Sequence, residues 1–503
     1  MLRDAVLIAT AAFTGLLLVV LAVVHIDDRY HVDAAAGAWM GLAAAARAGV
    51  WYPSVYAHGF YGGTRYAPLP IVAQAAAAAL TGSVLASAKV LILAVNAGLY
   101  AVVWTISRRR GAPRPLAAAL IAAMLASSAG QITMLGIRWD AFATLLQLTA
   151  LLLVADRSTR GRAALAGAAA GLALAVKISA LWGPAAVLVW LLVRDRRSAV
   201  WFVAAYLGVV GVLAGAFELL SDGRMLRQLN TFAFGGTQST SPTDGFHRLY
   251  QLALRNERLL PLFLALGVAG VVAAALRRRF GPYELAFCFL LPVLVVVMRD
   301  VGAYENHLLD LEVLAGIEVA GLWANVDRRR SREALRLVIA ACVVLATLNA
   351  LRYQAIPDVR RAASHELRGR ADPRYAKRPL PEEAAAGTCV LYEDASIPIL
   401  AGQRPTVLDA FILHRLQRAD PTALDALAQR IGDRTFSSIV LSFPLTNAGW
   451  FATLDFGTKL AAAMRADYRL ASESPDGSYF IYRPIGTARR PTACHLPSLS
   501  NWR

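Results

Sequence analysis

Residues 90–110 read VLILAVNAGLYAVVWTISRRR. This apolar run is long enough to cross a bilayer as a helix, and it ends in Arg108, Arg109 and Arg110. Short, positively charged loops stay on the cytoplasmic side of a membrane, so the run predicts a helix that ends in the cytoplasm. Similar arginine clusters separate the other apolar runs, at Arg114 and within residues 157–162, 194–197, 277–279 and 328–332. The pattern predicts an α-helical polytopic membrane protein.

The composition agrees with this class. The chain has 503 residues, of which 57% are hydrophobic, and a mean hydropathy of +0.49. Its net charge of +17 would suggest nucleic-acid binding in a soluble protein. Here the cytoplasmic arginines account for most of that charge, so we expect no nucleic-acid partner. The first apolar run, residues 5–25, is expected to be an uncleaved anchor, because no Ala-x-Ala site follows it; a cleaved signal peptide is the alternative.

The arginine clusters also orient the chain. We expect about eleven crossings, with the N-terminus in the cytoplasm and the C-terminus outside. The apolar run 67–86 is expected to be a shallow or re-entrant element on the outer side, because Pro68 and Pro70 break it and a full crossing would move every cluster outside. The expected crossings cover residues 5–25, 90–106, 115–135, 141–155, 163–180, 181–193, 199–217, 259–276, 283–298, 308–324 and 334–350.

The chain changes character after residue 350. We expect a multi-pass domain over residues 1–350, with its first outer loop at 26–89, then a polar linker at 351–381 and a soluble extracytoplasmic α/β domain at 382–503. Within this domain, strand patterns cover 388–393, 436–443 and 479–482, and helical patterns cover 421–431 and 450–466. A cap over the membrane part is its simplest role. Cys389 and Cys494 could pair if the domain is exported.

Ionisable residues at the ends of membrane helices are functional candidates, because burying charge in a bilayer is costly. In this topology they gather on the outer face, whereas the inner loops carry mainly arginine. This asymmetry predicts an outward-facing active site or pathway. The outer residues are Asp27, Asp28, Asp33, Arg138, Asp140, Lys177, Arg299, Asp300, Glu305, Asn306 and His307.

The first outer loop carries the clearest candidates. Asp33 precedes an Ala-rich interfacial helix, where it could act as a general base or simply cap the helix. Arg65 could grip a phosphate, as could Lys177 and Arg138, or it could pair with a lipid headgroup. The aromatic residues of the loop could form a sugar platform or an interfacial belt. They are Trp51, Tyr52, Tyr56, Phe60, Tyr61 and Tyr66.

Several short motifs, taken in order, resemble those of the GT-C glycosyltransferases. These are multi-pass enzymes that use a polyprenyl-phosphate-linked sugar, such as protein O-mannosyltransferases and lipid A aminoarabinose transferase. The resemblance lies in the acidic first loop followed by Arg65-Tyr66-Ala67-Pro68-Leu69. It continues in residues 136–142 around Arg138 and Asp140, in the Lys177 hairpin at 174–181 and in residues 302–311. Residues 401–405 and 479–484 resemble the exported tail of many bacterial members.

Two departures from the family pattern bear on the site. The first loop has Asp-Asp where members often carry Asp-Glu, and Asp33 lies nearer than Asp28 to the family's usual distance from its glycine, here Gly49. We therefore prefer Asp33 to Asp28 as the base. His307 replaces the usual aromatic residue after Asn306.

The resemblance implies an inverting membrane glycosyltransferase, a hexosyl- or pentosyltransferase of a bacterial plasma membrane. It would move a sugar from a polyprenyl-phosphate donor to a cell-envelope glycan, lipid or protein. Asp140 would orient the acceptor or help to hold a divalent metal ion if one is used; its alternative role is to neutralise Arg138. The implied sites are catalytic Asp33, Asp28 and Asp140, donor phosphate-binding Arg65, Lys177 and Arg138, and acceptor- or sugar-binding Tyr66, Glu305, Asn306 and His307.

Two other classes of function compete with this one. A polytopic transporter or lipid flippase would also bury charge, but it predicts internal repeats and broken helices near the midplane, and no such repeat is found. A non-enzymatic scaffold would leave the outer charged residues without a purpose.

Overall fold

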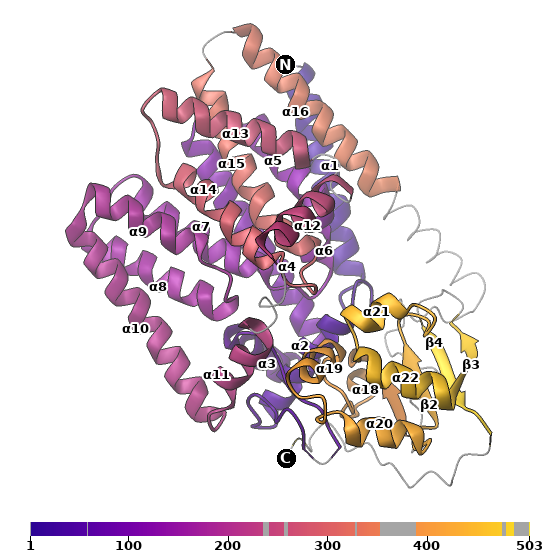
Figure 1. The fold of residues 1–503 in the computed structure, drawn as a ribbon. Helices are drawn as coiled ribbons and strands as arrows, with labels where there is room; N and C mark the ends of the chain where they lie inside the picture. Colours follow the sequence, from indigo (N-terminus) through magenta and orange to yellow (C-terminus); the bar gives the residue numbers. More distant parts are fainter. Residues whose placement is uncertain are drawn as a thin grey trace. The chain divides into compact units, whose positions relative to one another are not determined.

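The computed structural model describes residues 2–57, 59–234, 241–255, 260–326, 329–352, 389–474, 479–486 and 502. Most of these residues are helical, and one small sheet lies near the C-terminus (Figure 1). A helical protein with a small C-terminal α/β domain is therefore confirmed as the fold class. The predicted linker, apart from its first two residues, lies outside the described residues.

The chain forms two compact units. One comprises Met1–Val24, Val90–Leu213 and Thr240–Ser364, and the other comprises His25–Lys89, Ala214–Ser239 and His365–Arg503. The segment predicted as the first outer loop, for which we keep that name, thus belongs to the same unit as the C-terminal domain. We call these the helical unit and the loop unit.

The helical unit is built from apolar helices that pack through small residues. Helix α13 packs on α15, and a Cβ added to Gly270 of α13 would lie 2.4 Å from the Glu318 carbonyl oxygen of α15. Glycine therefore lets these two backbones approach closely. The helices of this unit are α1 Leu2–Val24, α4 Val84–Arg109 from Val90 onward, α5 Arg114–Ala126, α6 Ser128–Leu135, α7 Asp140–Ala155, α8 Arg160–Val176, α9 Trp182–Arg194, α10 Arg196–Leu220 as far as Leu213, α12 Pro242–Arg255, α13 Leu260–Leu276, α14 Pro282–Val297, η3 Glu305–Leu308, α15 Leu309–Asn325 and α16 Arg329–Ala350.

The expected number of crossings is not confirmed. Among the described residues, three helical stretches are long and apolar enough to cross a membrane: Leu7–Val24, Val84–Arg109 and Arg196–Leu220. A fourth span is added if the bent pair α5 and α6 counts as one. Other apolar helices, such as α7, α9, α13 and α14, have only 10–17 residues. The long apolar helices indicate a membrane protein.

The predicted crossing at 115–135 is not one continuous helix. The segment is two helices, α5 and α6, bent by 74° at Ser127. Ser127 has an extended backbone (φ −67°, ψ 160°), and its hydroxyl accepts a hydrogen bond from Gly130 N as the N-cap of α6. A serine cap therefore starts a new helix inside an apolar run, and hydropathy alone does not register such a cap.

The loop unit contains the C-terminal sheet. Its strand order is β1-β2-β4-β3, with β1 parallel to β2 and the other two pairs antiparallel. The elements of this unit are α2 Ala34–Arg47, α3 Pro68–Thr81, α11 Arg224–Gln228, η1 Leu229–Phe234, β1 Val390–Tyr392, α18 Ser396–Leu400, α19 Ala410–Ala419, α20 Asp425–Gly432, β2 Ser438–Leu441, α21 Ala448–Thr453, α22 Gly457–Asp467, β3 Tyr468–Glu473 and β4 Phe480–Pro484.

The three predicted strands are confirmed as β1, β2 and β4. Strand β3 was not predicted, because after the buried Tyr468 its residues are all exposed and show no alternation. The predicted helix 450–466 is two helices, α21 and α22. The break occurs where Phe456 (φ 56°) and Gly457 (φ 80°) adopt left-handed backbone conformations.

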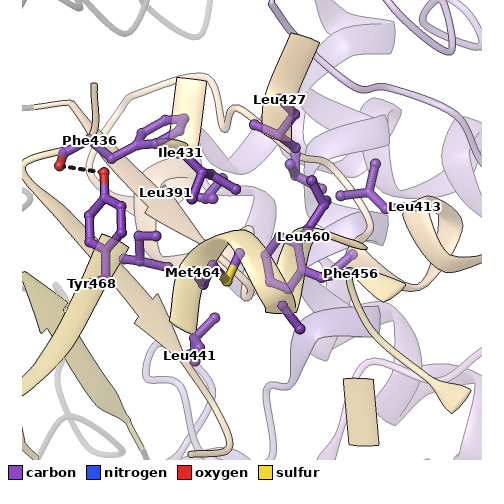
Figure 2. Packing of buried hydrophobic residues seen from close by; sticks show 14 of the residues in the cluster. Leu391, Leu413, Leu427, Ile431, Phe436, Leu441, Phe456, Leu460, Met464 and Tyr468 are labelled. Carbon is purple, nitrogen blue, oxygen red and sulfur yellow. Dashed lines mark hydrogen bonds between the residues drawn. The ribbon is translucent and has the colours of Figure 1, made fainter. Parts of the chain in front are cut away.

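A large apolar core helps to hold the C-terminal domain together. Side chains from the strands, from α20 and from α22 meet in this core, and the Tyr468 hydroxyl donates a 3.0 Å hydrogen bond to the Phe436 carbonyl (Figure 2). Tyr61 of the first outer loop belongs to the same core. Cys389 is disulfide-bonded, Cys288 and Cys342 are free thiols, and Cys494 lies outside the described residues.

The first outer loop is built into this domain. Tyr61 N donates to Thr406 O and Leu408 N donates to Tyr61 O, each at 2.9 Å. Helix α2 packs on α18 so closely that a Cβ on Gly37 would lie 2.5 Å from Ser396 N. The loop and the domain therefore form one compact body.

Helix α3 occupies most of the segment 67–86, which was expected to be a shallow or re-entrant element. Its 14 residues span about 21 Å at 1.5 Å per residue, less than the roughly 30 Å of a hydrocarbon core. It begins at Pro68 and ends before Gly82, whose φ is 74°. These bounds agree with an element that does not cross, and its position at the outer surface stays a prediction.

Candidate functional site

Asp140 is the centre of a polar cluster in the helical unit. Lys177 donates from Nζ to Asp140 Oδ1 at 2.5 Å, and Asn306 donates from Nδ2 to Asp140 Oδ2 at 2.9 Å. His307 Nδ1 lies 4.0 Å from Asp140 Oδ1. Three distant stretches of the chain thus bring four of the predicted site residues together.

Local structure places each of these side chains. Asp140 begins α7, where the helix dipole favours a carboxylate. Lys177 ends α8 with an extended backbone (φ −152°, ψ 117°), and Asn306 and His307 lie in the short turn η3 that precedes α15. Each of these residues therefore lies at or next to the end of a helix.

A second set of hydrogen bonds supports the cluster. Thr144, one turn after Asp140, donates to Asp310 Oδ1 at 2.5 Å. Ser128 donates to Glu305 Oε2 at 2.6 Å, and Ser127 donates to Glu312 Oε2 at 2.5 Å. The predicted residue Glu305 is therefore held by the N-terminus of α6. Arg138 is half-buried and lies two residues before Asp140, and Asp140 forms an ion pair with Lys177.

Asp28 in the loop unit is engaged through both carboxylate oxygens. Oδ2 lies 2.5 Å from His25 Nδ1, and Oδ1 accepts a 2.9 Å hydrogen bond from Tyr30 N. Lys89 donates from Nζ to the carbonyls of His25, Asp28 and Tyr30 at 2.5, 2.8 and 2.9 Å. Asp28 and Lys89 thus fix the start of the outer loop.

Lys89 was missed from the sequence. The available signal was its position inside the apolar stretch Val84–Arg109, since a buried lysine in such a helix requires partners. Its partners are carbonyls of a loop that lies about sixty residues earlier, with separations of 59 to 64 residues. No local pattern indicates such a contact.

Asp33 is exposed and caps helix α2. Its Oδ1 accepts a 2.9 Å hydrogen bond from Ala36 N, so the alternative interpretation as an N-cap is confirmed. A cap of this kind engages one carboxylate oxygen. Capping does not test the predicted role of Asp33 as a base.

Arg65 lies against the C-terminal domain. Its guanidinium carbon is 3.9 Å from the ring centroid of Phe411 and 5.7 Å from that of Tyr66. Tyr66 in turn stacks on Trp39, with ring centroids 4.1 Å apart. The predicted phosphate ligand and the predicted sugar ligand are therefore neighbours in the loop unit.

Two buried carboxyls of the C-terminal domain, Asp409 and Asp455, interact electrostatically with Arg65. Burial raises the pKa of Asp409 to about 6, and the nearby Arg65 offsets part of this rise. Burial and the neighbouring Glu393 raise the pKa of Asp455 well above its usual range, and the charge of Asp33 adds to the rise. Sequence reasoning missed all three, because acidic residues in a soluble domain are usually exposed.

The residues around Asp140 do not fit a metal ion. No three His, Cys, Asp or Glu side chains within the described ranges are grouped so that they could hold a metal ion. Asp140, the residue predicted to help with a divalent ion, uses its two oxygens on Lys177 and Asn306. An ammonium at 2.5 Å is a poor neighbour for a divalent cation, so we derive no step through a metal.

Solved structures of other proteins share this architecture. No family model matches the chain, and no curated protein matches it. Among solved structures, ArnT from Cupriavidus metallidurans bound to undecaprenyl phosphate superposes with a TM-score of 0.57 at 14% identity, covering 95% of this chain and 98% of that one. The chain has the GT-C fold.

Two further structures agree with this fold. The apo state of the same ArnT gives a TM-score of 0.57 at 15% identity, covering 94% of this chain and 97% of that one. The archaeal oligosaccharyltransferase AglB from Archaeoglobus fulgidus, in complex with an inhibitory peptide and a dolichol-phosphate, gives 0.50 at 12% identity, covering 94% and 74%. The GT-C resemblance expected from the motifs is thus confirmed for the fold, and the residue roles stay predictions.

Proposed function

We propose that the chain is an inverting membrane glycosyltransferase. It moves a sugar from a polyprenyl-phosphate donor to a cell-envelope glycan, lipid or protein on the outer face of the membrane. The observation that carries the proposal is the meeting of Asp140, Lys177, Asn306 and His307 within a GT-C fold. That a neighbour of this fold is bound to undecaprenyl phosphate supports the donor class.

The proposed reaction is a single displacement. The acceptor oxygen forms a bond to the anomeric carbon while the bond from that carbon to the phosphate oxygen breaks, which inverts the configuration. Asp33 takes the hydroxyl proton, and the electron pair leaves with the polyprenyl phosphate. Arg65, Lys177 or Arg138 stabilises the charge of the leaving phosphate. Tyr66 and Glu305 contribute to binding the sugar or the acceptor.

Asp33 is preferred to Asp28 as the base. Both oxygens of Asp28 already accept hydrogen bonds or contact a cation, and its neighbours His25 and Lys89 are buried with it. Asp33 is exposed, and an exposed carboxylate can reach an acceptor hydroxyl. Asp140 has a different role in this proposal, because it holds the Lys177 ammonium and the Asn306 amide in place.

We place the reaction outside the plasma membrane of a bacterium. The arginine clusters support a cytoplasmic N-terminus. The disulfide at Cys389 supports an oxidising compartment for the C-terminal domain, because such bonds persist mainly outside the cytosol. This domain would then be extracytoplasmic.

One observation favours a second candidate, a transporter or lipid flippase. Helices α5 and α6 are apolar and meet at a bend of 74°, and broken helices often line transport sites. Such a protein would bind lipid-phosphate sugars without releasing lipid phosphate. Catalytic turnover therefore separates the two functions.

The test is a transfer assay on the purified full chain with a panel of polyprenyl-phosphate sugars and candidate acceptors. We expect release of lipid phosphate by the wild type and a loss of roughly 100-fold or more in Asp33→Asn. Asp222→Asn is the matched control, because Asp222 is also exposed in the loop unit and asparagine tolerates its positive φ of 51°. Equal activity in Asp33→Asn would move the base to Asp28 or Asp140. Donor binding without turnover would favour the transporter, and failure to bind any donor would overturn the proposal.

A further inference from the structure

The contact between Arg65 and Phe411 joins the first outer loop to helix α19. The guanidinium carbon lies 3.9 Å from the ring centroid, a distance typical of stacking on the ring face. Phe411 is only 5% exposed, so its ring is fixed by its surroundings. The C-terminal domain thus gives Arg65 a rigid surface.

Asp409 reinforces this arrangement. It is the N-cap of α19, and its Oδ1 accepts a 3.1 Å hydrogen bond from Phe411 N, which fixes the backbone that carries the ring. Asp409 is 5% exposed, and its Oδ2 has no hydrogen-bond partner among the described residues. Arg65 is the cation that favours its charged form. Asp409 therefore supplies a counter-charge beside the stacked guanidinium.

Stacking suits an arginine that binds a phosphate. The N–H donors of a guanidinium lie in its plane, so a ring against its face restricts the orientation of the group without using a donor. A flexible arginine would lose side-chain entropy when it binds a ligand, and a stacked one has already lost it. The contact with Phe411 thus favours bidentate recognition of an oxyanion.

We propose that Phe411, with Asp409 as counter-charge, is a positioning residue that holds the Arg65 guanidinium ready for the phosphate of the lipid donor. The C-terminal domain then contributes to the donor site and is more than a cover for it. This inference rests on the proposed function, because it takes Arg65 to be a ligand of that phosphate.

The chain offers a matched control for the contact. The Arg430 guanidinium lies 4.7 Å from the ring centroid of Phe436, in the same unit. Phe436 is also buried, in the core drawn in Figure 2. Phe436→Leu therefore removes an equivalent stacking contact that has no proposed link to the donor.

The experiment measures the affinity of the purified full chain for polyprenyl phosphate, together with KM and kcat for the donor. We expect Phe411→Leu to weaken affinity and to raise KM by roughly 3- to 10-fold with a smaller change in kcat, the range of a cation–π contact. Phe411→Tyr keeps the ring face and should restore the affinity. Phe436→Leu should leave the affinity unchanged.

A double-mutant cycle distinguishes an effect of Phe411 through Arg65 from a general loss of structure. If Phe411 acts through Arg65, Phe411→Leu should have little further effect on affinity in an Arg65→Ala background. An equal loss in both backgrounds, or no loss in Phe411→Leu alone, would overturn the inference while the proposed function stood. A wild type that neither binds polyprenyl phosphate nor turns over any donor would overturn both.

Discussion

At the scale of single residues, the Asp140 carboxylate and the Lys177 ammonium form an ion pair. Asp140 is 7% exposed, and its two oxygens accept from an ammonium and an amide. Two charges withdrawn from water need good geometry and further hydrogen bonds to offset the cost of desolvation. The pair is therefore sensitive to the loss of either member.

Lys177→Met should destabilise the protein, because it leaves the Asp140 carboxylate buried without its cation. Breaking a buried pair costs about 3–5 kcal/mol. Adding Asp140→Asn removes the orphaned charge and should recover most of the thermal stability but not the binding of polyprenyl phosphate. Thermal unfolding and ligand binding measured on the same preparations check this. Recovery of both properties would mean that Lys177 is structural alone.

The raised pKa of Asp409 predicts how stability depends on pH. Between the ordinary value of 3.8 and about 6, the folded protein holds a proton that the unfolded chain has released. The stabilisation is therefore fully present at low pH and is lost as pH rises through about 6, up to about 3 kcal/mol. Denaturant unfolding of the full chain at pH 4.5 and 7.5 measures the change in the free energy of unfolding across this range.

Asp409→Asn provides the comparison. Asparagine keeps the N-cap but does not titrate, so the variant should gain stability relative to the wild type at pH 7.5 and show a shallower pH dependence. Asp455 and Glu393, whose pKa values burial also raises, leave a remaining slope of the same sign. Parallel profiles for the two proteins would contradict the assignment to Asp409.

At the scale of elements, close packing depends on a few glycines and caps. The bend between α5 and α6 places Gly130 against the preceding helix, where an added Cβ would lie 1.9 Å from Met124 O. The neighbouring residues Ser127 and Ser128 hold Glu312 and Glu305. The bend therefore determines where these two acids lie.

Gly130→Ala should lower the melting temperature, because a backbone carbonyl must move to admit the methyl group. The cost of such overpacking is about 1–3 kcal/mol or more. Gly208→Ala is the control, since nothing lies within 4 Å of a Cβ at Gly208 of α10. That variant should be neutral or slightly stabilising. Differential scanning fluorimetry on both variants tests this. Equal melting temperatures would show that the backbone at the bend can shift at little cost.

At the scale of the whole molecule, the first outer loop and the C-terminal domain form one compact unit although most of the chain separates them. The buried Arg29 guanidinium of the loop pairs with Asp394 and also donates to Ser396 Oγ at 3.0 Å and to Tyr479. Arg29 is 4% exposed, so this link lies in the interior of the unit. The two segments should therefore unfold together.

Arg29→Met should make both segments sensitive to protease, because it leaves Asp394 buried without its cation. Arg109→Met removes an ion pair whose side chains are 49% and 57% exposed, so it should change little. Limited proteolysis followed by mass spectrometry reports which segment is cut first. Cleavage confined to residues 25–89, with an intact C-terminal domain, would show that the domain folds independently.

The sequence by itself determined the class of the protein. Apolar runs and arginine clusters predicted a helical membrane protein, and the order of short motifs predicted its GT-C fold. The same motifs selected Asp140, Lys177, Asn306 and His307, which lie at helix ends. Such signals are local, because hydropathy, charge and helix ends are properties of neighbouring residues.

Only the tertiary structure decided how distant residues combine. It brought Lys89 to carbonyls of the outer loop, Phe411 to Arg65, and Asp455 and Asp409 into one buried neighbourhood. It also broke the run 115–135 into two helices. Contacts between residues far apart in the sequence depend on which faces pack together, and this follows from the shape of the whole unit rather than from any local pattern.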